Sequence, residues 1–408
     1  MGRFIHISTR RNLIYVIHLM IYYYLRKIDS IILNTKFKFK DSLIFAILMF
    51  LGEFFGGLTI FIYQSLASKQ KNRKGYHFGI KLIGNIFKLN RRDGYFKIVI
   101  LIFFAAFFNF MQFIIASFYI PKFNIVSTTA TYRFGGIIII IGALLCYFNL
   151  RIKILKHQFY SLIIIIICSI LMIIFEFIFK INGVLIKDFS LAYFFVICNL
   201  IFVAFTDIIE KYLLEFDFMD PFLTLLIESI FGFIFIAIFS FGNNPFEDVI
   251  RLFVENDVGN FIFLIILLVL YFVFSAGTNV YKILVNGLYS PMVKTLAVYI
   301  LNPFLFIYYF VTETDFMTGN NRNYFYFIIS IILALIISFF GCVFNEVIVL
   351  FCCGLAHETH SSIKKRATED VEERNFSAYN ERDVSLDEVI VSNINDPDLT
   401  LNELDDEE

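Results

Sequence analysis

Four charged side chains lie inside apolar stretches, where an unpaired charge is unfavourable. Glu53 occurs in LMFLGEFFGG and Glu228 in LLIESIFGF, and in both cases a glycine follows four residues later. Arg133 and Lys294 form a second matched pair, because each lies four residues after a Thr or a Ser. Charged groups in mid-membrane usually face the interior of a helix bundle. Two acids and two bases facing one cavity would neutralise each other when the cavity is empty and could bind a charged solute when it is filled.

Amide side chains extend this candidate binding site. Asn109 and Gln112 lie three residues apart and therefore share one face of a helix, and Asn279 and Lys282 do the same in a later segment. We expect both pairs to contact the substrate, although amides in membrane helices also serve helix–helix hydrogen bonds. A further adjacent pair ends a span on the cytosolic side and is predicted to act as a gate or a helix cap: Glu210 and Lys211.

Motifs of catalysis, cofactor binding and ion channels are missing from the sequence. It contains no HExxH, no P-loop, no glycine-rich dinucleotide fingerprint and no TVGYG filter. A lipid-modifying enzyme would need a polar catalytic cluster near one membrane face, and the sequence suggests none. We therefore predict that the protein is not an enzyme, with no catalytic residue, no metal site and no cofactor.

The elements that position these residues must be membrane-spanning helices. The 408-residue chain is 59% hydrophobic, and its mean hydropathy is +0.76. Its apolar runs approach or exceed the roughly 20 residues that cross a hydrocarbon core. Runs such as IIIIIGALL do not alternate in polarity as barrel strands do. Nine spans are expected at 43–66, 95–117, 125–149, 157–180, 190–213, 219–241, 259–285, 289–311 and 324–351, and a tenth, at 12–34, is interrupted by charges. Pro303 should kink the helix in which it lies.

Charge in the connections predicts the orientation and a tail. The segments 67–94 and 150–156 and the residues that follow the last span are rich in Lys and Arg, which is typical of the cytosolic side. From Ala367 to Glu408 the chain has 15 acidic residues against two Arg. Such a segment is expected to be a disordered cytosolic tail. The expected organisation is a divergent first helix in 1–42, two helical halves at 43–180 and 190–351, and the tail at 367–408.

An internal repeat is suggested by the two matched pairs. With ten spans, the glutamates fall in helices 2 and 7 and the cations in helices 4 and 9, so each pair differs by five helices. An odd number of helices per half inserts the second half upside down. The predicted fold is therefore all-α and polytopic, with about ten transmembrane helices in two inverted five-helix repeats.

Four stretches resemble the drug/metabolite transporter superfamily, specifically its nucleotide-sugar-transporter-like solute carriers of the F type: MFLGEFFGG, ATYRFGGIIII, DIIEKYLLEFDFMDPFLTLLIESIFGF and SIILALIISFFGCVFNEVIVL. The similarity runs over about 43–350 and is most specific from Asp207 to Phe233. Lys294 stands where the relatives carry an arginine, and no acid follows it before Asn302, which departs from the family pattern. The first helix departs from that pattern as well. The resemblance implies a ten-helix inverted-repeat carrier in an internal membrane.

Two functions remain open at this stage. The first is a secondary carrier that moves a small polar metabolite by alternating access. An anionic solute such as a nucleotide sugar would suit the cations, whereas the paired acids would equally suit a cation or coupled protons. The second is a non-transporting scaffold or receptor whose cytosolic tail recruits partners. The expected partners are a small-molecule substrate, the lipid bilayer and, as a further arrangement, a second copy of the chain in a homodimer; no nucleic acid is expected. The predicted location is an endomembrane, with the C-terminus in the cytosol.

Overall fold

The structure of the chain is a computed structural model. It describes residues 10–37, 43–70, 94–119, 135–149, 154–180, 186–215, 217, 219–241, 250–251, 254, 258–305, 307, 321–348, 359 and 362. Every regular element among these residues is helical, which confirms the predicted all-α class. The predicted tail, the basic segment between 71 and 93 and Arg133 lie outside the described residues.

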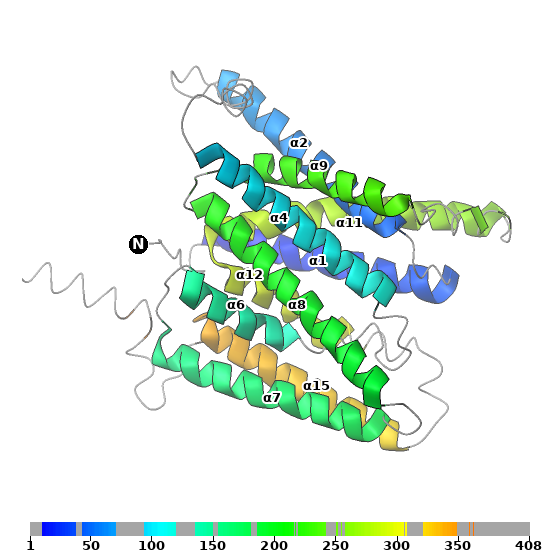
Figure 1. Cartoon of the computed structure of the whole chain (residues 1–408), viewed down its shortest axis with the longest axis vertical. Helices are drawn as coiled ribbons and strands as arrows, with labels where there is room; N and C mark the ends of the chain where they lie inside the picture. The colour runs from blue at the N-terminus through cyan, green and yellow to red at the C-terminus, as the bar shows by residue number, and fades with distance from the viewer. Residues whose placement is uncertain are drawn as a thin grey trace, which may run out of the picture. The chain divides into compact units, whose positions relative to one another are not determined.

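Ten α-helices are described (Figure 1): α1 (Arg10–Phe37), α2 (Ile44–Gln70), α4 (Gly94–Ile114), α6 (Gly135–Asn149), α7 (Lys156–Lys180), α8 (Ile186–Glu215), α9 (Pro221–Ser240), α11 (Val258–Leu288), α12 (Pro291–Tyr299) and α15 (Asn321–Phe344). A short π-helical segment, η1 (Ile115–Tyr119), continues α4. The helices run side by side through the unit formed by residues 1–348.

Seven of the described helices are long and apolar enough to cross a membrane, namely α2, α4, α7, α8, α9, α11 and α15. The chain is therefore a polytopic membrane protein, as its composition predicts. Two of the nine expected spans are shorter, and the tenth candidate is a helix that contains the charges noted in its sequence. α6 and α12 are apolar but have only 15 and nine residues, and α1 has 28 residues but includes Arg26, Lys27 and Asp29. In the segment predicted at 125–149, the described helix begins at Gly135.

The helix predicted at 289–311 is shorter for local reasons. Ser290 caps α12, because its hydroxyl oxygen accepts a hydrogen bond from the amide of Val293 at 3.2 Å. α12 ends at Tyr299, and after a turn the chain is helical again from Asn302 to Leu305. Pro303 lies at the start of this second piece, where its missing amide hydrogen removes no helical bond. The kink predicted at Pro303 is therefore replaced by a break before it: the helix ends at Tyr299, and Pro303 lies in the next helical piece.

Glycines let α2 and α11 approach closely. A Cβ atom on Gly52 would lie 2.7 Å from the backbone nitrogen of Ala276, and one on Gly56 would lie 2.9 Å from the side chain of Val280. From the first contact to the second, the chain advances by four residues on α2 and by four residues on α11, so the two helices run parallel here. Contact between small residues is how membrane helices commonly pack, since lipid offers no hydrophobic driving force between them.

The remaining packing links helices that are distant in sequence. α1 packs on α11, α4 on both α8 and α9, and α2 on α9 as well as on α11. α6 packs on α8 and α12, α7 on α15, and α12 on α1 and α15. The start of α7 meets the end of α15, where Gln158 donates to the carbonyl of Phe344 at 3.2 Å. Figure 1 shows these two ends, together with the end of α2, on its left-hand side.

Outward faces of the helices are apolar, as a lipid environment requires. On α7 the exposed residues include Ile163, Ile166, Ile167 and Ile170, which share one helical face. A second row of exposed aliphatic residues on α11 has the same spacing: Ile262, Ile265, Ile266 and Val269. A water-soluble protein would rarely expose such continuous apolar stripes. The bilayer is therefore a partner of the described helices.

Candidate functional site

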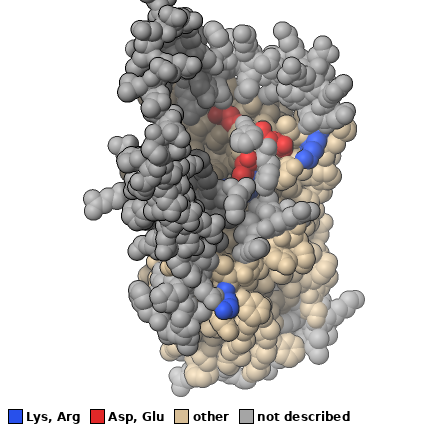
Figure 2. All heavy atoms as spheres, turned by 90° about the vertical axis from the view of Figure 1, so that its left-hand side faces the viewer, with Lys and Arg blue, Asp and Glu red and all other residues tan. Residues whose placement is uncertain are grey.

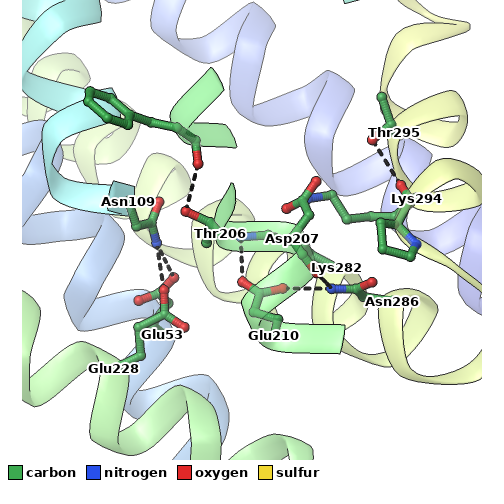
Figure 3. A network of polar contacts seen from close by, with 12 residues as sticks. Glu53, Asn109, Thr206, Asp207, Glu210, Glu228, Lys282, Asn286, Lys294 and Thr295 are labelled. Atoms are coloured by element: carbon green, nitrogen blue, oxygen red, sulfur yellow. Dashed lines mark hydrogen bonds and ion pairs between the residues drawn. The ribbon is translucent and has the colours of Figure 1, made fainter. Parts of the chain in front are cut away.

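Two buried glutamates share one amide in the interior of the helical unit (Figure 3). Asn109 of α4 donates its side-chain nitrogen to Oε1 of Glu53 on α2 and to Oε1 of Glu228 on α9, both at 3.2 Å. Glu53 is 1% exposed and Glu228 is fully buried. We call Glu53 and Glu228 the carboxyl pair. The sequence analysis predicted that these three residues belong to a binding site, and the structure brings them together.

The packing of α2 and α9 places the two glutamates at one level. A Cβ on Gly57 would lie 3.0 Å from the carbonyl oxygen of Phe222, near the start of α9. One turn beyond Glu228, Gly232 packs against the ring of Phe50, before Glu53. The helices therefore run antiparallel, and Glu53 faces the middle of α9, where Glu228 lies. Gly57 and Gly232 each follow their glutamate by four residues, so the shared motif supplies both the acid and the close approach.

A second group of charges lies toward the end of α8 (Figure 3). Glu210 of α8 forms an ion pair with Lys282 of α11, with Nζ and Oε1 2.8 Å apart. Asn286 donates to the other carboxylate oxygen of Glu210 at 3.1 Å and to the backbone carbonyl of Asp207 at 2.8 Å. The Asp207 carboxylate in turn pairs with Lys294 of α12. We call these five residues the ion-pair group.

Helical spacing explains why these side chains meet. Asp207 and Glu210 lie three residues apart and share the inner face of α8. A polar stripe on α11 is completed by residues spaced four, three and four apart: Ser275, Asn279, Lys282 and Asn286. α12 begins at Pro291, so Lys294 falls in its first turn, close to the ends of α8 and α11. Three helices thus present polar faces to one another, away from lipid.

Charge is balanced in one part of the site and unbalanced in the other. In the ion-pair group two acids match two lysines, and each lysine has its own carboxylate partner. Among the described residues, no cation contacts Glu53 or Glu228, and the second oxygen of each has no hydrogen-bond partner there. Buried charges are retained when they are paired and hydrogen-bonded. The carboxyl pair therefore lacks a positive counterpart within the described part of the chain.

The other predicted site residues have separate environments. Lys211 points away from Glu210, because neighbouring positions on a helix do not face each other. It donates to the carbonyls of Gly287 and Tyr289 at 3.1 and 3.0 Å and pairs with Glu215 at 3.3 Å. The predicted gate residues thus make different contacts, and Glu210 belongs to the ion-pair group instead.

Two of the predicted amides differ in their surroundings. Asn279 is 4% exposed, and its amide nitrogen has no hydrogen-bond partner among the described residues. Gln112 is half-buried one turn after Asn109. Arg133 lies outside the described residues. Of the predicted side chains, six therefore meet in the carboxyl pair with its amide and in the ion-pair group: Glu53, Asn109, Glu228, Glu210, Lys282 and Lys294.

Sequence reasoning did not single out Asp207 and Asn286 as site residues. Both could have been found from spacing alone. Asp207 lies three residues before Glu210, and Asn286 lies four residues after Lys282, so each shares a face with a residue already proposed. A rule that extends every intramembrane charge by three or four residues would have identified them.

Acidic residues also mark the connection between α8 and α9. Glu215, Asp217 and Asp220 are each partly exposed. Asp220 caps α9 by accepting hydrogen bonds from the amides of Phe222 and Leu223 at 2.9 and 3.1 Å. Figure 2 shows Asp and Glu side chains gathered in a hollow on the side of the molecule where this connection lies. Burial raises the pKa of Asp220.

Comparison of the chain with models of protein families and with curated proteins found no match. In the described part of the chain, no group of three or more His, Cys, Asp or Glu side chains is placed to hold a metal ion. The site is thus characterised by its own geometry: buried acids, lysines and amides from six helices, converging inside a membrane-embedded unit.

Proposed function

We propose that the protein is a secondary carrier that moves a small polar solute across an internal membrane by alternating access. The observation that carries this proposal is the ion-pair group. Burying two lysines and two carboxylates among helices gives no clear gain in stability over apolar side chains. Intramembrane charges that face the interior commonly mark substrate or ion pathways. A scaffold has no need of such a group in its interior.

The packing of the helices supports an inverted repeat, as in carriers of this kind. Counted along the chain, the ten described helices can be divided into α1 to α7 and α8 to α15, five in each half. In this division the first helix of one half corresponds to the first helix of the other, and so on: α1 to α8, α2 to α9, α4 to α11, α6 to α12 and α7 to α15. The contact of α1 with α11 then corresponds to the contact of α8 with α4, and both contacts occur. The contact of α2 with α11 becomes that of α9 with α4, which also occurs.

Three contacts join counterparts directly, namely α2 with α9, α6 with α12, and α7 with α15. The antiparallel direction of α2 and α9 agrees with an inverted relation. Glu53 and Glu228 are then symmetry-related residues, and both bind the same amide at the same distance. This agreement supports two halves that rock about a central site, in line with the resemblance to the drug/metabolite transporter superfamily.

The substrate proposed from the cations is a small anionic metabolite, for example a nucleotide sugar. In the described structure Lys282 and Lys294 pair with Glu210 and Asp207. An anionic solute could take over these lysines, so that the site exchanges internal partners for substrate without leaving a cation unpaired. Such exchange links binding to the opening of contacts among α8, α11 and α12, which alternating access requires.

The test begins with the purified full-length protein and a ligand screen. Nucleotides, nucleotide sugars, organic anions and amines are compared by thermal shift, because a ligand that binds the folded state raises its stability. Compounds that stabilise the protein are then loaded into proteoliposomes, and exchange is measured with the same compound on both sides. The expected result is stabilisation by one class of anion and exchange of that class.

Variants connect the result to the site. Lys294→Met should abolish exchange of an anionic substrate and its thermal shift, while Lys97→Met, at an exposed lysine near the start of α4, should leave both unchanged. Arg133→Ala is expected to lower exchange as well. Stable protein that neither binds nor exchanges any member of the screen would contradict the proposal and favour a scaffold or receptor. Equal exchange by wild type and Lys294→Met would contradict the placement of the site.

A further inference from the structure

We propose that Glu53 and Glu228 hold one proton between them in the described structure, and that this proton is the ion to which transport is coupled. The coupling rests on the proposed carrier function, whereas the shared proton rests on the carboxyl pair alone. The carboxyl pair then acts as a second site, separate from the lysines that would bind an anionic solute.

The geometry of the carboxyl pair leaves little means of stabilising two negative charges. One amide, that of Asn109, serves one oxygen of each carboxyl group, and the remaining oxygens have no hydrogen-bond partner among the described residues. Exposures of 1% and 0% leave almost no access for water. Two adjacent carboxylates in such a site cannot both remain ionised, and a shared proton relieves their repulsion.

The charges that surround the carboxyl pair have other partners. From α11, Lys282 is bound to Glu210 of α8, and from α12, Lys294 is bound to Asp207 of α8. α4 contributes the neutral amide of Asn109, and the described side chains of α2 and α9 contribute no further charge. Glu210 and Lys282 act on both glutamates with opposite sign: the lysine outweighs Glu210 at Glu53, whereas Glu210 outweighs the lysine at Glu228.

Buried polar side chains on α11, at the height of Glu53, are a separate observation that bears on the protonation of the carboxyl pair. Gly52 and Gly56 lie beside Ala276 and Val280, which places Glu53 between the levels of Ser275 and Asn279 on α11. The side chains of Ser275 and Asn279 are 0% and 4% exposed, and the Asn279 amide nitrogen has no partner among the described residues.

Asn279 also shares its face with Lys282, which points to Glu210. An unused donor thus lies level with unused acceptor oxygens on Glu53 and Glu228. When the site opens, the proton passes from a carboxyl oxygen to a water molecule, leaving both carboxylates ionised. The amides of Asn109 and Asn279 can then donate one hydrogen bond to each. Closing reverses the transfer, and no other bond forms or breaks.

The proton is favoured over a larger cation because the carboxyl pair is closed on all sides by its neighbours. A sodium ion or an amine would need several oxygen ligands and the space to hold them. The described residues offer two carboxyl groups as ligands. The polar group next to them is the side-chain nitrogen of Asn109, a hydrogen-bond donor that would repel a metal ion. A proton needs only the two oxygens.

Infrared spectroscopy of the purified full-length protein in lipid nanodiscs tests the shared proton without any substrate. The carbonyl band of protonated carboxyl groups is followed while the buffer is changed between about pH 5 and about pH 9, a window that lies above the usual pKa values of carboxyl groups, so that ordinary carboxylates stay ionised throughout it. The wild type is compared with Glu53→Gln, Glu228→Gln, the double variant and Glu215→Gln. Glu215 is a partly exposed acid outside the carboxyl pair and serves as the matched control.

The expected result is a carboxyl band in the wild type that disappears only at alkaline pH. The part of the band that the carboxyl pair contributes is the difference between the wild type and the double variant, because other buried acids such as Asp220 contribute equally to both. Each single variant should lose its part at a lower pH than the wild type, because the repulsion by the second carboxylate is gone. Glu215→Gln should match the wild type. Equal bands in the wild type and the double variant at neutral pH would overturn the proposal.

Two further arms separate other cations from the proton. Sodium added at constant pH should leave the band unchanged, and its loss on adding sodium would assign the carboxyl pair to a metal ion instead. Arg133→Gln should also leave the band unchanged; a new or larger band in that variant would show that the arginine neutralises the carboxyl pair. If the band behaves as expected but exchange is independent of a pH gradient, the shared proton stands and the coupling fails.

Discussion

Replacing Lys282 with methionine should strand a buried carboxylate. Methionine retains most of the length of the lysine side chain but removes the ammonium group that lies 2.8 Å from Oε1 of Glu210. Glu210 is 1% exposed and would keep only the hydrogen bond from Asn286 at 3.1 Å. Oε1 of Glu210, which binds Lys282 in the wild type, would then have no cation in contact with it.

The size of the effect follows from the burial of the two partners. Removing one partner of a buried ion pair costs about 3–5 kcal/mol of stability. Lys282 is 16% exposed, and one amide still binds Glu210, so we expect the lower end of that range, about 3 kcal/mol. Adding Glu210→Gln removes the stranded charge and should restore about 2 kcal/mol, since a neutral amide is far easier to bury than a carboxylate.

Reversible unfolding of the purified variants in lipid nanodiscs measures these differences. Glu215→Gln is the control, because Glu215 pairs with Lys211 at a site where the acid is 29% exposed and the pair is worth less than about 1 kcal/mol. Equal stability of the wild type and Lys282→Met would refute the argument that Glu210 depends on this lysine. A double variant less stable than Lys282→Met would refute the stranded charge as the cause.

Three further predictions concern packing, capping and topology. Gly52→Ala places a Cβ 2.7 Å from the backbone nitrogen of Ala276 and should lower stability by about 1–3 kcal/mol, whereas Gly259→Ala, with nothing within 4 Å, should be neutral or stabilising in the same unfolding assay. Asp220→Ala should cost about 1 kcal/mol through the lost cap of α9, and Asp220→Asn should retain most of it. Because burial raises the pKa of Asp220 in the folded protein, its contribution to stability falls as the pH rises above the unfolded value, and Asp220→Asn should remove that part of the pH profile. The segment after Leu350 should be digested by protease added to intact right-side-out organelle vesicles; digestion only after lysis would reverse the predicted orientation.

The amino-acid sequence alone was enough to predict that this protein lies in a membrane and to identify charged residues that needed an explanation. Long apolar runs specify membrane helices, because backbone polar groups in lipid must be satisfied within each segment. Glu53 and Glu228 could be selected from the same fact, since a carboxylate in lipid is so unfavourable that it must face the interior. The glycine that follows each glutamate by four residues lies at the contact between α2 and α9, which only the structure shows.

Which charges meet depends on how the helices pack. Lys282 and Glu210 lie 72 positions apart in the numbering, and nothing in their local patterns states that α8 and α11 face each other. The sequence paired Glu210 with its neighbour Lys211, but helical geometry points adjacent side chains in different directions. From the sequence we also expected Arg133 and Lys294 to neutralise the two glutamates in one cavity. In the described structure each of the two lysines already binds an acid of α8, and the carboxyl pair is left without one. That imbalance arises from the packing of distant helices, which spacing along one chain does not encode.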